Sequence, residues 1–306
     1  MCFSLCKLID VTEIIMSNGI VTVKVNKPMA CRSFFRTRRE CLMYPNSKLR
    51  LVDVSKTFST VNGGFTALSS LSMDVSPGRF VSLIGPSGCG KSTLFNIIAG
   101  LETPSTGRIE IDGENLTGLI GRVGYMLQKD LLLPWRTVID NIVLGMEIQG
   151  MSRKDARDKA RPYLKRYGLG DFETQFPSAL SGGMRQRAAL LRTLLLDNDV
   201  ILLDEPFGAL DAQTKAQMQE WLLNIWEDFG KTVVFVTHDI EESIYLSDEI
   251  CVMGTRPGRL IERISVPMAR PRPRSVVTQT SFVELKQRCM DLLNEPHHEP
   301  PRVAAE

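Results

Sequence analysis

The alternation of apolar and polar residues along the chain predicts a series of short strands. Residues 49–58 (LRLVDVSKTF) alternate the two kinds, as a strand with one buried face does. Other segments are short and almost wholly apolar, or lie between glycines. These predict further strands at FVSLI (80–84), GRIEIDG (107–113), VILLD (200–204) and TVVFVTH (232–238).

Helical patterns separate these strands. STLFNIIAG (92–100) has helical spacing and ends at Gly100, and residues 138–170 are rich in charge and in helix formers. A further set of apolar residues falls on one face of a helix that Gly230 closes, namely Met218, Trp221, Leu222, Ile225, Trp226 and Phe229. Because strands alternate with helices, the pattern predicts an α/β fold with a mostly parallel sheet.

Residues 1–47 lack this pattern. They show little periodicity, so we expect a disordered extension or a start codon placed too early, with Met16 and Met43 as alternative starts. The competing interpretation is an arm that binds nucleic acid or lipid, which rests on a basic patch formed by Arg32, Arg36, Arg38 and Arg39.

The C-terminal end also differs from the centre of the chain. ARPRPR predicts a proline-rich linker from residue 269, because proline resists both helix and central strand. A tail to residue 306 follows, with one short helix at 282–293. His297 and His298 have no partners in the tail, and we expect them in solvent.

Composition limits the class of protein. The chain has 306 residues, of which 43% are hydrophobic and 24% charged, as in an ordinary soluble globular protein. A net charge of +2 gives no strong attraction to nucleic acid or acidic lipid, and we expect no nucleic-acid partner. Seven scattered cysteines without metal-type spacing indicate free thiols in a reducing compartment. No apolar run reaches the roughly 18 residues of a membrane span, and no secretory signal is evident, so any role at a membrane is exerted from its surface through partners.

The segment GPSGCGKST (85–93) carries the strongest chemical signal. It fits G-x-x-x-x-G-K-[ST] between a predicted strand and a predicted helix. Glycines let backbone N–H groups approach a phosphate chain, and the start of the helix favours the anion further. Lys91 can reach the outer phosphates, and Ser92 can place its hydroxyl on Mg²⁺. A glycine turn with a chance lysine is the structural alternative.

Two further motifs extend this reading. In VILLDEP, Asp204 ends a buried strand and can hold Mg²⁺, and Glu205 can orient or deprotonate an attacking water. In LSGGMRQR (180–187), Ser181, Gly182 and Gly183 precede a helix and offer a second anion site. With one ATP per chain, that site would serve the ATP of another copy, which implies a dimer. An acidic helix cap and a capped turn are the respective alternatives.

Together, these residues resemble the nucleotide-binding subunit of an ABC transporter over roughly residues 49–268. GPSGCGKST matches the Walker A loop, LSGGMRQR the signature motif and VILLDEP the Walker B strand with its catalytic glutamate. ALDAQTK, with Asp211, matches the D-loop. Gln128 in GYMLQKD matches the Q-loop glutamine, and His238 in VTHD matches the switch histidine.

The resemblance implies a P-loop NTPase fold over residues 48–268, with a mostly parallel core sheet, an antiparallel β subdomain and a helical subdomain at about 129–180. It implies ATP and Mg²⁺ as cofactors, with catalysis by Glu205, His238 and Gln128, and Mg²⁺ held by Ser92, Gln128 and Asp204. The residues it implies for ATP binding are Phe58, Gly85, Pro86, Ser87, Gly88, Cys89, Gly90, Lys91, Ser92, Thr93, Ser181, Gly182, Gly183 and Asp211. Phe58 is the candidate for stacking on adenine, and Phe65 is its alternative.

QKDLLLPWRTVIDNI and MGTRPGRLIERISVPMARPR are similar to the nitrate, sulfonate and taurine importer branch. The resemblance therefore implies an ATPase on the cytoplasmic face of the cell membrane, dimeric, and bound to a permease dimer near Gln128 and residues 131–135. A solute-binding protein would supply a small anion such as nitrate, an alkanesulfonate or taurine. Import of a thiamine precursor or a riboflavin-like solute is the alternative.

A soluble ABC ATPase outside transport is the more distant alternative, disfavoured because the chain has no coiled-coil insertion between residues 92 and 180. A translation factor would carry two phosphate loops, and only one is present. Glu205, His238 and Gln128 argue against a regulator that binds without hydrolysing, and the two importer-like segments argue against an exporter. The solute itself is chosen by other chains.

Overall fold

A computed structural model describes residues 11–17, 20–25, 47–60, 63–255 and 257–294. The chain divides into two units, residues 1–45 and 46–306. In the first, β1 (Val11–Ser17) pairs antiparallel with β2 (Ile20–Val25). This hairpin was not predicted from the sequence, although both segments are dense in β-branched residues. The basic patch, Met43, His297 and His298 lie outside the described residues.

The second unit is built on a six-stranded sheet with the order β12-β11-β5-β10-β9-β8, parallel except for the edge strand β12. The predicted parallel sheet is therefore confirmed. The strands are β5 (Phe80–Ile84), β8 (Gly124–Met126), β9 (Val200–Asp204), β10 (Thr232–Val236), β11 (Glu249–Gly254) and β12 (Arg259–Ser265).

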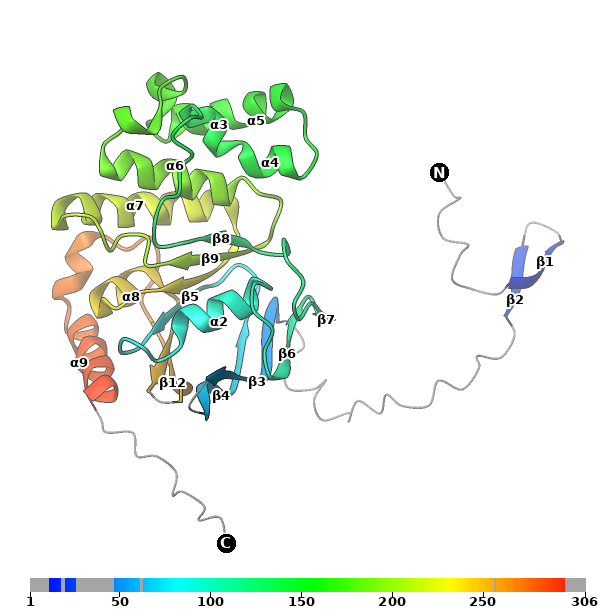
Figure 1. The fold of residues 1–306 in the computed structure, drawn as a ribbon, viewed down its shortest axis with the longest axis horizontal. Coiled ribbons are helices and arrows are strands. Elements are labelled where there is room, and N and C mark those ends of the chain that lie inside the picture. The colour runs from blue at the N-terminus through cyan, green and yellow to red at the C-terminus, as the bar shows by residue number, and fades with distance from the viewer. Residues whose placement is uncertain (1–10, 18–19, 26–46, 61–62, 256, 295–306) are drawn as a thin grey trace, which may run out of the picture. The chain divides into compact units, whose positions relative to one another are not determined.

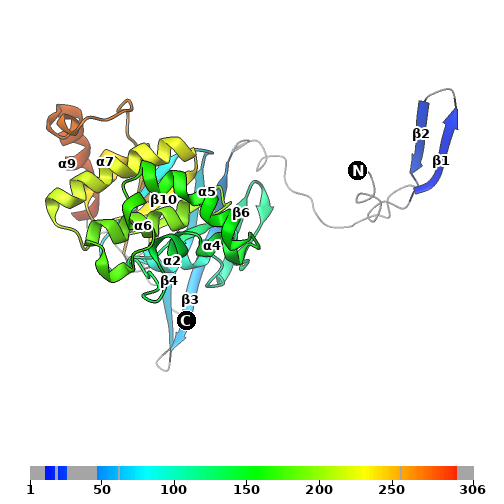
Figure 2. The ribbon, with the colours of Figure 1, turned by 90° about the horizontal axis from the view of Figure 1, so that it is seen from above.

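A second, antiparallel sheet has the order β4-β3-β6-β7, as expected for the β subdomain. In the view from above, β3 and β4 extend away from the helices (Figure 2). The strands of this antiparallel sheet are β3 (Leu49–Thr60), β4 (Gly63–Val75), β6 (Thr106–Ile111) and β7 (Glu114–Asn115).

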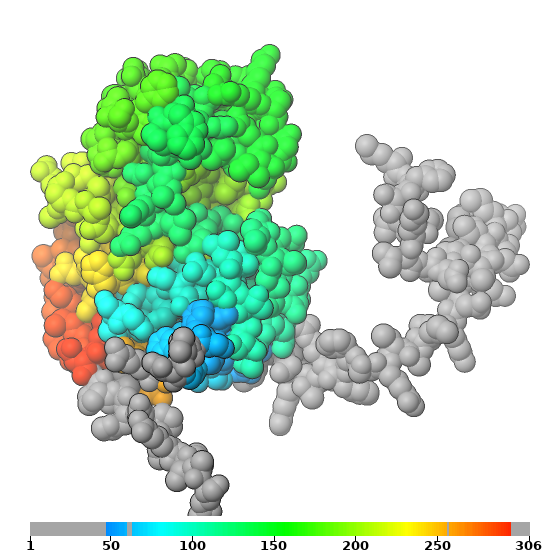
Figure 3. Space-filling view, in the orientation of Figure 1, coloured from blue at the N-terminus to red at the C-terminus, as the bar shows by residue number. Residues whose placement is uncertain are grey.

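Helices cover both faces of the parallel sheet, and α3, α4 and α5 gather at one end of the unit (Figure 1). In the space-filling view the same end of the unit is green, the colour of this part of the chain (Figure 3). All three helices lie within the segment 129–180. The α-helices are α2 (Lys91–Ile98), α3 (Val138–Ile142), α4 (Leu144–Ile148), α5 (Arg153–Arg166), α6 (Gly182–Leu194), α7 (Ala212–Phe229), α8 (Ile240–Leu246) and α9 (Thr280–Asn294). Short 3₁₀ turns lie at Gly170–Phe172, Pro177–Ala179 and Arg274–Thr278.

Successive residues of the central strands point into two different cores. Along β9, Ile201 and Leu203 join the core that α6 and α7 cover, whereas Val200 and Leu202 join the core shared with α2 and the antiparallel sheet. All four side chains are buried, because alternation in a strand with both faces covered requires apolar residues at every position. The sheet thus separates α2 from α6.

Up to residue 294, the segment predicted as a linker and tail packs against the domain. Arg272 is buried, and its guanidinium donates to the carbonyls of Ile244, Tyr245 and Ser247 at 2.7–2.9 Å, around the end of α8. The proline-rich stretch therefore packs against the domain and is fixed to it by Arg272. The helix expected at 282–293 forms as α9, which buries Phe282 and Cys289.

Candidate functional site

The phosphate loop lies between β5 and α2, and close packing requires glycine at two of its positions. Gly90 caps α2 with φ at 95°, and a Cβ there would lie 2.7 Å from Leu68 Cδ2. A Cβ on Gly85 would lie 2.8 Å from the carbonyl oxygen of Met253. Any side chain at either position would displace the loop, because real Cβ contacts are not that short.

Lys91 folds back over this loop. Its ammonium donates to the carbonyls of Gly85 at 2.7 Å and Pro86 at 3.1 Å, and the residue is 9% exposed. Ser87, Gly88 and Ser92 are exposed, Pro86 and Thr93 are partly buried, and Cys89 is fully buried beneath the loop. A buried cation beside the N-terminus of a helix can bind a polyphosphate.

Two neighbouring carboxylates follow β9, in different surroundings. Asp204 is 8% exposed, and the hydroxyl of Tyr125 donates to its Oδ2 at 3.4 Å. Burial and the adjacent charge of Glu205 raise the pKa of Asp204. Glu205 is less buried and has a positive φ of 45°, which is costly for a residue with a side chain. Its N–H donates to the carbonyl of Val236 at 2.9 Å, which ties it to β10.

Glu205 is the point at which the predicted catalytic residues meet. Gln128 Nε2 donates to Glu205 Oε2 at 3.2 Å, and His238 Nδ1 lies 3.2 Å from the same oxygen. These side chains follow β8, β9 and β10, which are adjacent parallel strands. Because such strands present their carboxyl ends at one edge, residues distant in sequence converge there.

The signature residues lie elsewhere in the same chain. Ser181 caps α6 by accepting the N–H of Met184 at 3.3 Å, and Gly182 and Gly183 open the helix. Since α2 and α6 cover opposite faces of the sheet, a single chain keeps these residues apart from the phosphate loop (Figure 1). Asp211 caps α7 by accepting the N–H groups of Gln213 at 3.1 Å and Thr214 at 3.0 Å.

Both candidates for adenine stacking lie on the antiparallel sheet. Phe58 and Phe65 are directly opposite each other on β3 and β4. Lys56 lies 4.9 Å from the centroid of the Phe58 ring and also pairs with Glu102. Phe65 is 49% exposed, whereas Phe58 is partly buried.

Sequence reasoning missed Tyr125. The residue lies in GYMLQKD, three positions before Gln128, and its hydroxyl lies 3.4 Å from both Asn96 Oδ1 of α2 and Asp204 Oδ2, so its single proton can bond either oxygen. It thus joins the helix that follows the phosphate loop to the buried carboxylate. Only the pairing of β8 with β9 reveals this role, because the sequence does not specify the order of strands.

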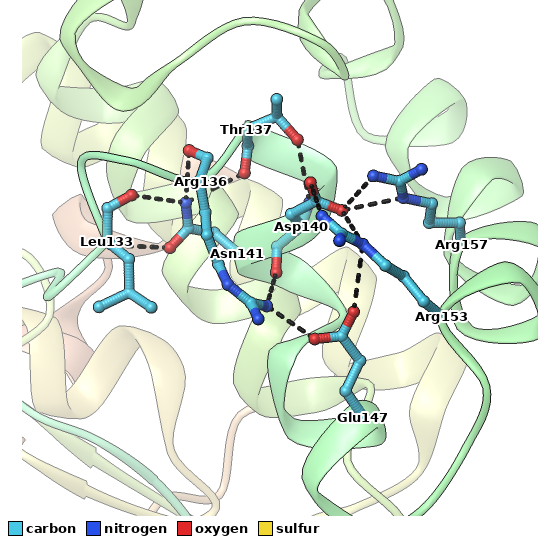
Figure 4. Close-up of polar contacts among 8 residues, drawn as sticks. All are labelled: Leu133, Arg136, Thr137, Asp140, Asn141, Glu147, Arg153 and Arg157. Carbon is cyan, nitrogen blue, oxygen red and sulfur yellow. Dashed lines mark hydrogen bonds and ion pairs between the residues drawn. The ribbon is translucent and has the colours of Figure 1, made fainter.

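A network of polar side chains holds the loop that follows Gln128 (Figure 4). Asn141 is fully buried, accepts the N–H of Leu133 at 2.6 Å and donates to the carbonyls of Leu133, Arg136 and Thr137. Asp140 accepts from Arg153 and Arg157, each at 2.6 Å. In the same loop Leu132 is buried in the core, whereas Leu131 and Trp135 are 51% and 72% exposed.

We expect Asp140→Asn to lower the free energy of unfolding by about 2 kcal/mol at neutral pH, because two charge-assisted bonds weaken. Although burial acts against it, bonding from Arg153, Arg157 and Thr137 holds the pKa of Asp140 below its usual value. A carboxyl with a lowered native pKa stabilises the fold above its unfolded pKa of about 4, and this contribution is lost as the pH falls through the native pKa.

The difference between wild type and Asp140→Asn in urea unfolding should therefore stay nearly constant from pH 7 to about 5 and narrow as the pH falls below about 4. Asp158→Asn is the matched control, because Asp158 forms an exposed pair with Arg161 in α5. It should cost less than about 0.5 kcal/mol. An Asp140→Asn cost equal to this control, or independent of pH, would contradict the role given to the network.

Comparison with known proteins assigns the family. The model of the ABC transporter family matches residues 68–208. The chain is 43% identical to an aliphatic sulfonates import ATP-binding protein, SsuB, of Bacillus cereus, over 78% of this chain and 92% of the relative. It is 47% identical to a taurine import ATP-binding protein, TauB, of Yersinia pestis bv. Antiqua, over 66% of this chain and 80% of the relative.

Solved structures agree with this assignment. A dimeric, post-hydrolysis ATP-binding cassette bound to ADP and phosphate has 31% identity and a TM-score of 0.63, and the match covers 72% of this chain and all of that one. The chain belongs to the ABC transporter ATP-binding family and has its P-loop ATPase fold. The resemblance to the sulfonate and taurine importer branch is confirmed, and the chain is an ATP-binding ABC ATPase. No helix in the described part of the chain is long and apolar enough to cross a membrane.

Proposed function

We propose that this chain is the ATP-hydrolysing subunit of a membrane importer for small anions such as taurine, alkanesulfonates or nitrate. The convergence of Gln128 and His238 on one oxygen of Glu205 carries the hydrolytic part of this proposal. The names of the sulfonate and taurine relatives support the solute class. The anionic solute would be delivered by a solute-binding protein and would not contact this chain.

The residues present fit a magnesium ion bound with ATP. Ser92 offers a hydroxyl, Asp204 a buried carboxylate, and Gln128 an amide oxygen, since its nitrogen is the atom that bonds Glu205. The described residues contain no cluster of three or more acidic, histidine or cysteine ligands. That agrees with Mg²⁺, which takes few protein ligands and completes its shell with phosphates and water. When bound, Mg²⁺ neutralises charge on the phosphates.

Glu205 is the general base in the proposed mechanism. Its carboxylate accepts a proton from the water that attacks the γ-phosphate, and Gln128 and His238 hold that carboxylate in place from two sides. His238 is 64% exposed at its side chain, so its imidazole can also reach a γ-phosphate. Lys91 and the backbone of residues 85–93 hold the phosphate chain.

The complete site requires a second copy of the chain. Ser181, Gly182 and Gly183 lie at the start of a 13-residue helix, on the face of the sheet that α2 does not cover. A head-to-tail dimer would bring these residues of one copy to the γ-phosphate held by the other. Asp211, which opens α7, would lie at the same interface. The dimeric cassette among the relatives supports this arrangement.

The exposed apolar residues Leu131 and Trp135 suit a docking surface for a permease. The loop that carries them begins three residues after Gln128 and is held rigidly by Asn141. Closure of the dimer around ATP would therefore move this surface together with the edge of the sheet that carries Gln128, Glu205 and His238. The chain would act as a peripheral subunit on the cytoplasmic face of the cell membrane.

We propose Phe58 as the residue that stacks on adenine. Phe58→Ala should weaken ATP binding about tenfold, since stacking on a nucleobase contributes roughly 1–3 kcal/mol. Titration with a fluorescent ATP analogue measures the change. Phe65→Ala is the matched variant across the strand pair. A larger loss for Phe65→Ala than for Phe58→Ala would assign the stacking to Phe65.

Solute uptake tests the proposal. The chain would be reconstituted in vesicles with its permease and binding protein, and ATP-dependent uptake measured for taurine, an alkanesulfonate, nitrate and a thiamine precursor. Uptake of one of the three anions supports the proposed class. Uptake of the thiamine precursor, or of a riboflavin-like solute, favours the alternative. ATP hydrolysis that requires none of these partners would favour a soluble ABC ATPase.

A further inference from the structure

A partly buried polar cluster links α7 to the segment that carries His238. It consists of Lys215 and Gln219 of α7 and of Thr237, Asp239 and Glu242. Lys215 Nζ lies 2.7 Å from Asp239 Oδ2 and 3.5 Å from Glu242 Oε1. Gln219 Nε2 donates to Glu242 Oε1 at 2.9 Å, and Thr237 donates to the other oxygen of Glu242.

This cluster holds the backbone on both sides of His238. The Asp239 N–H donates to Thr237 Oγ1 at 3.0 Å, so Thr237 and Asp239 are joined across the histidine. Asp239 also caps α8 by accepting the Glu242 N–H at 3.2 Å. The side chain of His238 itself makes its contact in the other direction, toward Glu205.

Lys215 differs from an exposed ion-paired lysine because it contacts a buried carboxylate and lies near the start of α7. Glu242, Gln219 and Thr237 are all at most 5% exposed, whereas the side chains of Lys215 and Asp239 are partly exposed, so Lys215 reaches a buried carboxylate from the rim of the cluster. Lys215 lies one turn after Asp211, where α7 begins, and its N–H donates to the Asp211 carbonyl at 2.8 Å. The same helical turn thus starts at the proposed dimer interface and ends against the flank of His238.

We propose that Lys215 is a positioning residue for His238, acting through Asp239 and Glu242 to hold the imidazole against Glu205. This proposal rests on the proposed function of His238 in hydrolysis. Lys215 does not touch the nucleotide. It would set how often the imidazole is in reach of Glu205 and the γ-phosphate, and so it would affect turnover and not ATP binding.

The charges of the cluster are consistent with this role. Although burial disfavours its charged form, the bond from Lys215 and the N–H groups at the start of α8 hold the pKa of Asp239 below its usual value. Burial likewise opposes the charge of Lys215, yet bonding with Asp239 and Glu242 raises its pKa. Lys215 and Asp239 are therefore both ionised at neutral pH, and a neutral residue at 215 would leave Asp239 without its cation.

The test compares Lys215→Met with wild type in the full chain. We expect kcat for ATP hydrolysis to fall about tenfold, with the KM for ATP unchanged, because misplacement of a catalytic group slows the reaction without weakening binding. Lys215→Arg should restore most of the activity. Lys286→Met is the matched control, because Lys286 pairs with Glu241 of the same helix α8 at an exposed site, and its kcat should be unchanged.

The decisive step is the double variant with His238→Ala. If Lys215 acts through His238, Lys215→Met should cause no further loss of kcat once the imidazole is absent. An equal tenfold loss in both backgrounds, or a loss confined to KM, would overturn the proposal. If His238→Ala alone left kcat unchanged, the proposed function of His238 would fail instead. Should Lys215→Met not fold, Gln219→Met removes the bond to Glu242 from the same helix, and the same comparison applies.

Discussion

Replacement of Glu205 by glutamine is expected to lower the kcat for ATP hydrolysis by a factor of about 10²–10⁴, the usual contribution of a positioned general base. Glutamine has the same shape but cannot accept the proton of the attacking water. Its amide can still lie between Gln128 and His238, so the edge of the sheet should keep its geometry. ATP binding should be retained, because Lys91 and the phosphate loop are unchanged.

Phosphate release measures the loss, and titration with a fluorescent ATP analogue measures the binding. A dimer trapped by ATP should also become visible in gel filtration, since the nucleotide that joins the two copies is no longer hydrolysed. Glu227→Gln is a suitable control, because Glu227 is an exposed glutamate on α7. If Glu205→Gln retained more than about a tenth of the wild-type kcat, a different residue would have to be the base.

The second large effect concerns the shared site. Lys91→Met should abolish hydrolysis by removing the buried cation of the phosphate loop. Gly182→Asp should abolish it by placing a carboxylate where the γ-phosphate of the other copy would bind. The new side chain has room, since a Cβ at Gly182 meets its nearest atom at 3.8 Å. An acidic residue in the first turn also favours the helix, so α6 should remain folded.

Mixing the two inactive variants distinguishes a shared site from a self-contained one. A mixed dimer pairs Lys91 of one copy with Gly182 of the other and so contains one intact site. An equal mixture should therefore recover up to roughly a quarter of wild-type activity, because half of the dimers are mixed and each has one of two sites. Activity that stays at zero on mixing, or a Gly182→Asp variant that hydrolyses ATP normally, would contradict the shared site.

The sequence predicted the parts of the molecule that local pattern determines. The buried strands at 80–84 and 200–204 have the observed bounds, and Gly230 adopts the left-handed conformation that ends α7. The phosphate loop was equally clear, because its pattern G-x-x-x-x-G-K-[ST] is contiguous and lies directly between a strand and a helix. These features depend on neighbours in sequence, so a single chain is sufficient to find them.

Contacts between distant segments could not be predicted. Tyr125 reaches Asp204, and Lys215 reaches Asp239, only because particular strands and helices are adjacent in space. The ARPRPR stretch was expected to be a linker because proline excludes helix and central strand. The structure instead uses Arg272 to bind the carbonyls around the end of α8, which a compositional argument does not reveal.

The central claim is that hydrolysis at Glu205 drives a permease, and the most direct measurement is the ATPase rate in lipid with and without that permease. The claim predicts a wild-type rate that rises when the permease and the solute-loaded binding protein are both present. It also predicts that the rate is lost in Glu205→Gln under all conditions. A high wild-type rate indifferent to the permease would contradict the claim of transport, and a stimulated rate in Glu205→Gln would contradict the assignment of the base.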